Sequence, residues 1–260
     1  MIGSVHVMGP DDLAELDRLL DLFQEWRKRI TLPRLGYNTP RPGGALLTDQ
    51  PLPNGDLPCT LAWRAMAGGC EHLAFIAEYS RANDLEVRPK PFAVLARAAL
   101  LGAAKAAYLL EPDSAQERRH RSLKLFTSEV SNTEKVLSDI NLLPASERPD
   151  DYLRADREMR QLIDASKRAL VAEGFKERTR IDETPLLLTV SHLLDIGKGD
   201  PAAGVMTSWR YTSGVAHSMS WHWDLLPVDE DPSQQLAYTI GAPGRLMEEA
   251  WKLWELRRAE

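Results

Sequence analysis

The stretch PKPFAVLARAALLGAAKAAYLL, residues 89–110, decides the fold of this chain because it is the most apolar run in the sequence. Its opening prolines suit the first turn of a helix. Small side chains recur along it and give a thin face for close contact with another helix: Ala93, Ala96, Ala99, Ala103 and Ala107. Arg97 and Lys105 lie near its middle, where charges are costly in a bilayer. We therefore predict a buried helix of a soluble protein and no membrane partner.

Apolar side chains recur at helical spacing in most of the remaining chain. The pattern predicts further helices over residues 10–30, 59–81, 114–142, 150–172, 184–196, 202–220 and 233–258. We expect Gly68-Gly69 to bend or split the second of these helices, and Gly241 and Pro243-Gly244 to interrupt the last one. The sequence thus predicts an all-α fold, an elaborated helical bundle of about seven to nine helices. Residues 1–260 are predicted to form one domain.

Residues 31–58 break the helical pattern. They contain six prolines and four glycines, so no regular element can persist there. A segment of this length without regular structure is long for a compact domain, which leaves a linker, a mobile lid or an arm as interpretations. We expect an irregular, partly packed loop.

Composition bounds the function classes. The chain has 260 residues, 43% of them hydrophobic, a net charge of −6 and a pI of about 5.6, so no global basic field attracts nucleic acid, although a local basic cleft stays open. The densest basic patch, residues 117–124, begins a predicted helix and opposes its dipole, which hints at a role beyond helix stability. Cys59 and Cys70 show neither metal spacing nor a disulfide framework. We predict a cytoplasmic protein with no metal and no cofactor.

A second stretch carries the functional hypothesis: Ser208-Trp-Arg-Tyr-Thr-Ser-Gly-Val-Ala-His-Ser218. Arg210 and His217 are seven residues apart, so they lie on nearly the same line of a helix, separated by a rise of about 10 Å. Ser213 and Gly214 lie between them and are small, so they leave the helix surface open there. Arginine holds phosphate, and histidine transfers protons near neutral pH. The pair therefore suits attack of a ribose 2′-hydroxyl on the adjacent phosphate without a metal.

Arg210, followed by six residues and His217, resembles the R-x(4–6)-H signature of the HEPN superfamily. Its members are helical, many are metal-independent ribonucleases of toxin–antitoxin and phage-defence systems, and they often act as dimers. The resemblance implies that Arg210 and His217 are catalytic, and that RNA, an antitoxin or other protein, and a second copy are the partners. Where the family has Asn, Asp or His after the arginine, this chain has Tyr211. The chain is also similar to uncharacterised actinobacterial all-helical proteins with an R-x-x-S-x-x-x-H segment, a likeness that implies no activity.

Six further residues are predicted to bind the substrate: Arg97, Trp209, Tyr211, Ser213, Gly214 and Trp221. Two other hypotheses remain open. In the first, the protein is a non-catalytic helical interaction or oligomerisation protein, and Arg210 and His217 form a structural network in which an acidic residue pairs with the arginine. In the second, Trp209, Trp221 and Trp223 line a small-molecule site.

Overall fold

The computed structural model describes residues 10–32, 36–85, 88–140, 142, 144, 150–176, 181–194, 199–217, 219 and 232–259. Within these ranges the chain forms eight α-helices and no strand, so the all-α prediction is confirmed. The helices are α1 (Pro10–Thr31), α2 (Pro58–Ala82), α3 (Pro89–Leu110), α4 (Ala115–Ile140), α5 (Asp150–Ala172), α6 (Glu183–Val190), α7 (Pro201–Ala216) and α9 (Pro232–Ala259). Two short 3-10 turns, η2 (Ala45–Leu47) and η4 (Ser191–Leu193), complete the described elements.

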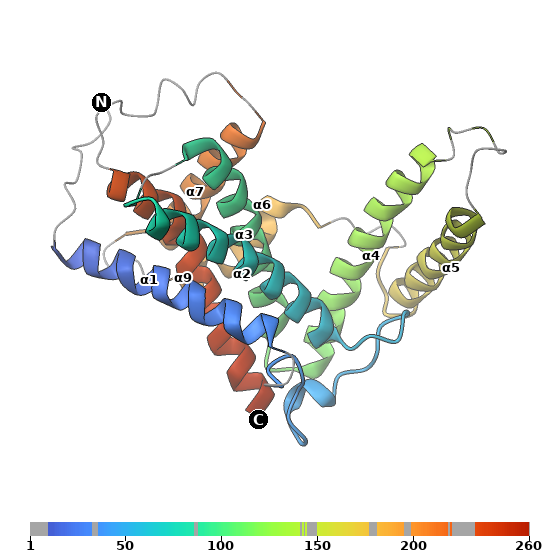
Figure 1. Cartoon of the computed structure of the whole chain (residues 1–260). Coiled ribbons are helices and arrows are strands. Elements are labelled where there is room, and N and C mark those ends of the chain that lie inside the picture. Colours follow the sequence, from blue (N-terminus) through green and yellow to red (C-terminus); the bar gives the residue numbers. More distant parts are fainter. Residues whose placement is uncertain are drawn as a thin grey trace.

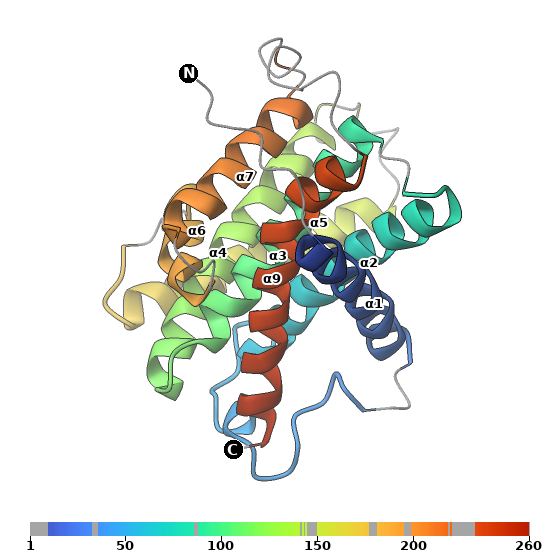
Figure 2. The ribbon, with the colours of Figure 1, turned by 90° about the vertical axis from the view of Figure 1, so that its left-hand side faces the viewer.

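The central helix is α3, which packs against α2, α9, α7 and α6 (Figures 1 and 2). Its alanine face allows near contact of two backbones: a Cβ placed on Gly102 would lie 2.5 Å from the carbonyl oxygen of Ala65 in α2. The helix is long and apolar enough to cross a membrane, but 61% of its apolar stretch is buried inside the structure. Its middle cation Lys105 pairs with Glu129 of α4 at 2.7 Å. These surroundings are those of a core helix.

The predicted split of α2 and the predicted interruption of α9 are wrong, because both helices are continuous, with Gly69, Pro243 and Gly244 buried within them. Helix α2 runs unbroken through Gly69, where a Cβ would meet the carbonyl oxygen of Ala99 at 3.2 Å and the Met247 side chain. Helix α9 runs unbroken through Pro243, which is buried. The next residue, Gly244, lies under the Phe23 ring of α1, with 2.8 Å between its ideal Cβ and the ring. The packing offsets the backbone penalties of glycine and proline.

Residues 36–57, which we call the strap, are irregular apart from η2 but are held against the bundle by contacts near both ends. At one end Trp254 of α9 donates from Nε1 to the carbonyl oxygen of Tyr37 at 3.0 Å. At the other end Arg119 of α4 donates to the carbonyl oxygens of Gln50 and Pro51. The described part of the strap therefore packs partly against the bundle, as we expected of an irregular loop.

The basic patch at the start of α4 serves these internal contacts. Arg118 is 2% exposed and forms two hydrogen bonds, of 2.8 and 3.1 Å, with the fully buried carboxylate of Asp49 in the strap. Arg121 pairs with Glu111 at 2.7 Å and with Glu117 at 3.1 Å. The role beyond helix stability that the sequence hinted at is to hold the strap and the end of α3.

Helices α4 and α5 form a hairpin that projects from the bundle (Figure 1). The first half of α4 lies against α2 and α3, while α5 packs against α4. We call residues 132–139 of α4 and 150–162 of α5 the arm. Side chains described in the arm are mostly exposed, and they include Val136 at 61% and Tyr152 at 48% exposure.

Candidate functional site

Helix α7 carries the predicted catalytic pair. It begins where the side chain of Asp200 accepts a hydrogen bond from the backbone of Ala202 at 3.0 Å, with Pro201 at the first helical position, a standard helix start. It ends at Ala216, earlier than the predicted 202–220 range. His217 is the C-cap, and its N–H donates to the carbonyl oxygen of Ser213 at 2.9 Å. The histidine is therefore held by the last turn of α7.

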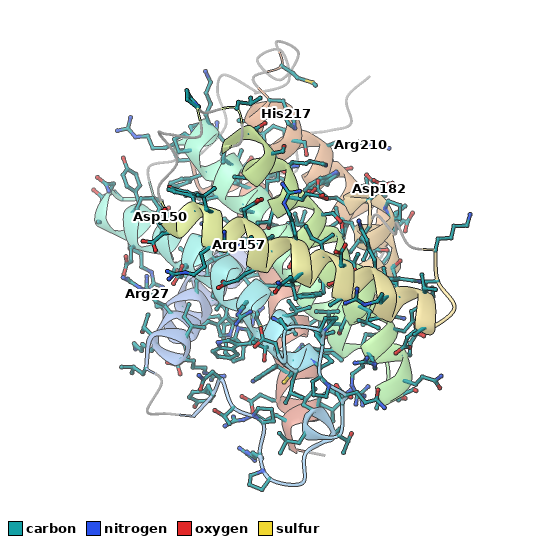
Figure 3. All side chains as sticks on the ribbon, turned by 90° about the vertical axis from the view of Figure 1, so that its right-hand side faces the viewer. Arg27, Asp150, Arg157, Asp182, Arg210 and His217 are labelled. Carbon is teal, nitrogen blue, oxygen red and sulfur yellow. The ribbon has the colours of Figure 1, made fainter. Side chains whose placement is uncertain are left out.

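Arg210 and His217 are both exposed and lie on the side of α7 that faces away from the core. Trp209, Thr212 and Val215 form the opposite, buried side. No hydrogen bond or ion pair joins the side chain of Arg210 or His217 to another residue that the structure describes. Figure 3 shows both residues towards one end of the molecule. Both side chains are thus accessible to a ligand.

Arg97 of α3 lies behind this face, and its guanidinium contacts residues of α6 and α7. Its Nε donates to Ser213 Oγ at 3.0 Å, and its Nη2 contacts Glu183 of α6 at 3.1 Å. Its guanidinium lies 4.3 Å from the centre of the Trp209 ring, a distance at which a cation–π attraction operates. Arg97 therefore ties α3, α6 and α7 together and fills the space beside Ser213 that the sequence analysis left open.

The remaining predicted residues divide into three cases. Tyr211 is half-buried, and Gly214 is buried. Trp221, together with Trp223 of the small-molecule hypothesis, lies outside the described residues. The structure thus brings Arg97, Trp209 and Ser213 into contact, and it leaves Arg210 and His217 accessible on the outward side of the same helix.

Sequence reasoning missed the acidic residue of this region, Glu183. It lies 86 positions from Arg97, and no motif marks it as a partner.

Two surface hollows of the described structure lie away from α7: one of about 460 Å³ lined by α5 residues, and one of about 390 Å³ beside the strap and the start of α4. Among described residues no group of three or more His, Cys, Asp or Glu could hold a metal ion.

No family model, curated protein or solved structure matches this chain. Its function is therefore inferred from its own residues.

Proposed function

We propose that the outward face of α7 binds a phosphodiester of RNA and cleaves it without a metal, as the likeness to the HEPN motif implies. The observation that supports this proposal is the exposure of Arg210 and His217 on one side of a single helix, without a partner among the described residues. Arg97 supports it indirectly, because its contacts hold α7 rigidly and leave Arg210 unneeded for packing. Preorganised groups of this kind need no rearrangement at the moment of reaction.

In this mechanism Arg210 binds and polarises the phosphate through a bidentate contact. His217 takes the proton of the ribose 2′-hydroxyl as its oxygen attacks phosphorus. The new bond to the 2′-oxygen forms as the bond to the 5′-oxygen breaks, and the leaving 5′-oxygen takes up a proton. Tyr211 or the Ser213 hydroxyl positions the substrate. The products carry a 2′,3′-cyclic phosphate and a 5′-hydroxyl.

The proposal describes a cytoplasmic toxin or defence factor whose partners are RNA and a protein antitoxin. Its test is the incubation of purified protein with a mixed RNA pool in EDTA, followed by analysis of the product ends. We expect 2′,3′-cyclic phosphate ends with the wild type and a loss of rate of about 100-fold or more in Arg210→Ala and His217→Ala. Thr207→Ala is the matched control, because Thr207 is exposed on the same helix.

Both catalytic variants should keep the unfolding free energy within about 0.5 kcal/mol of the wild type, because the side chains are exposed. Cleavage that continues in both variants, or no cleavage by folded wild type, would overturn the proposal. Loss of the thermal transition in the variants would show instead that the pair is structural.

A non-catalytic interaction or oligomerisation protein is the second candidate. It is favoured by α5, whose charged outer side is uncovered in the described structure. The internal network that this hypothesis expected around Arg210 is built on Arg97 instead. The second candidate predicts an intact RNA pool and a change of self-association when α5 is substituted.

A further inference from the structure

Helix α5 has a continuous outer line of exposed polar side chains. The line alternates in steps of four and three residues, the spacing of a helix-pairing seam. Its members, all exposed, are Asp150, Arg154, Arg157, Gln161, Asp164 and Arg168. We call this set the α5 seam. Figure 3 shows α5 crossing the front of the molecule, with Asp150 and Arg157 labelled on it.

The charges of the α5 seam change sign on reflection about position 159. If the seam is laid against a copy of itself running in the opposite direction, each residue i meets residue 318 − i of the copy. The resulting pairs are Asp150 with Arg168, Arg154 with Asp164, and Arg157 with Gln161. Every pair of two charges is therefore of opposite sign, and the third pair can form a hydrogen bond between guanidinium and amide oxygen.

The pairs of the α5 seam also set the relative direction of the two helices. A parallel pairing in register gives the reverse, because each charge would then meet its own copy. Like charges in contact are destabilising, so the pattern selects the antiparallel arrangement.

We propose that the α5 seam is the interface of a homodimer, in which the α5 helices of two copies pack antiparallel about a two-fold axis at the level of Met159. Such an interface is isologous, because both copies contribute the same surface. The inference does not depend on the proposed ribonuclease activity.

The described structure leaves this surface available. Helix α5 buries only Ile163, Ser166 and Leu170 among its described side chains. Pairs within the helix, such as Arg154 with Asp151 at 2.8 Å, are highly exposed and are worth little in water. A partner carboxylate can therefore replace them at small cost.

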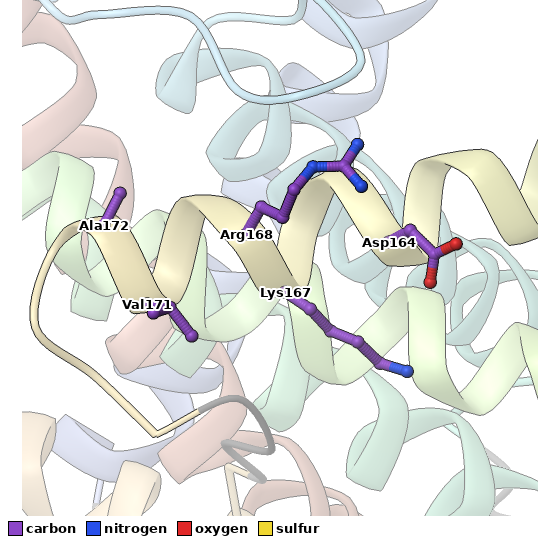
Figure 4. Close-up of a pocket in the computed structure, with 5 residues that line it drawn as sticks. All are labelled: Asp164, Lys167, Arg168, Val171 and Ala172. Atoms are coloured by element: carbon purple, nitrogen blue, oxygen red, sulfur yellow. The ribbon is translucent and has the colours of Figure 1, made fainter.

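A hollow of about 460 Å³ lies on the C-terminal half of the same side, lined by Asp164, Lys167, Arg168, Val171 and Ala172 (Figure 4). In the antiparallel arrangement, the N-terminal turn of the partner's α5 lies over this hollow. That turn begins with Asp150, whose carboxylate complements Arg168 of the hollow. Val171, which is 56% exposed, supplies apolar contact beside them.

Because the seam is polar and one helix wide, we expect a weak dimer, with a dissociation constant on the order of micromolar or higher. Salt should weaken it further, since exposed charge pairs are screened over about 8 Å at physiological ionic strength. Sedimentation equilibrium of the full chain at low and high salt measures both properties.

Charge inversion tests the register of the proposed interface. In Arg154→Asp two carboxylates face each other twice, and in Asp164→Arg two guanidinium groups do so. Each variant alone should raise the dissociation constant by about tenfold or more. An equimolar mixture of the two variants should recover wild-type association, because the mixed dimer restores opposite charges at both positions.

Lys28→Asp and Asp17→Arg in α1 are the matched controls, since both residues are exposed and the variants change the net charge by the same amounts. They should leave association unchanged, and circular dichroism should show that all four variants are folded. A wild type that stays monomeric at about 100 µM in low salt, a dimer insensitive to both inversions, or a mixture that does not recover would each overturn the proposal.

Discussion

Helices α3 and α5 have nearly the same length, 22 and 23 residues, yet the molecule uses them in opposite ways. Twelve residues of α3 are buried, and its neighbours press close enough that glycine and alanine are needed at the contacts. Only three residues of α5 are buried among those described. The comparison shows that helical periodicity alone does not reveal whether a helix serves as core or as surface.

The largest effect should come from the buried ion pair at the foot of the hairpin. Arg118→Met leaves the carboxylate of Asp49 buried and uncompensated, and should lower the free energy of unfolding by about 3–5 kcal/mol in urea titrations. The double variant Arg118→Met/Asp49→Leu should recover most of this loss. Lys135→Met, on the exposed part of α4, is the control and should change stability by less than about 0.5 kcal/mol. Equal effects in Arg118→Met and Lys135→Met would contradict the contrast between buried and exposed regions.

Truncation of an apolar side chain should lower the free energy of unfolding more in the bundle than in the arm. Leu100 in α3 is fully buried, so Leu100→Ala should destabilise the protein by about 2–5 kcal/mol. Val136 in α4 is 61% exposed, and Val136→Ala should cost less than about 0.5 kcal/mol. Thermal or urea unfolding of both variants gives the ratio. A loss of more than 1–2 kcal/mol in Val136→Ala would mean that the arm is covered in solution.

Two glycines of the α2–α3 region should respond with opposite signs. A methyl group on Gly102 would press on the carbonyl oxygen of Ala65, while Gly68 has nothing within 4 Å of an added Cβ. Gly102→Ala should therefore destabilise the fold by about 1–3 kcal/mol. Gly68→Ala should stabilise it by about 0.5–1 kcal/mol, because alanine is the better helix former. Denaturation midpoints of the two variants check the signs, and equal shifts would show that the close approach of α2 and α3 is wrong.

The smallest effect concerns a thiol in the core. Burial raises the pKa of Cys70 from its ordinary value of 9.0 to about 12, with a smaller opposite effect of the hydrogen bond from Trp251. Because the folded state holds the thiol neutral, its contribution to stability is complete below pH 9 and is lost as pH rises towards 12. Between pH 9 and pH 10 the wild type should lose about 1 kcal/mol relative to Cys70→Ala. Unfolding curves at the two pH values measure this change, and a constant difference between the proteins would show that Cys70 is accessible to water.

Local sequence signals located the helices well. The predicted ranges 89–110 and 150–172 coincide with α3 and α5, because prolines or acidic residues mark their first turns and periodicity marks their bodies. The same signals failed at Gly69 and Pro243, where contacts with other helices decide the backbone path. The seam of charges on α5 was also readable in the sequence, but only the structure showed that this side is uncovered.

The candidate site was predicted only in part. The spacing of Arg210 and His217 placed both on one side of a helix, and α7 does so. The spacing could not show which side faces the core, because that depends on where α3 and α6 pack. The contact between Arg97 and Ser213 was not predictable for the same reason, because it joins residues 116 positions apart. The ribonuclease role of Arg210 and His217 and the single-domain organisation remain predictions.

By itself the sequence determined the helical class, the position of most helices and the irregular character of residues 36–57 within the predicted range 31–58, because turn chemistry and hydrophobic period act over a few neighbouring residues. The tertiary structure alone decided that the cations of residues 117–124 hold the strap, that Arg97 pairs with Glu183, and that Arg210 and His217 remain accessible. These outcomes depend on contacts between distant segments. A buried charge takes whichever partner the fold brings within a few ångströms, and sequence spacing does not encode that distance.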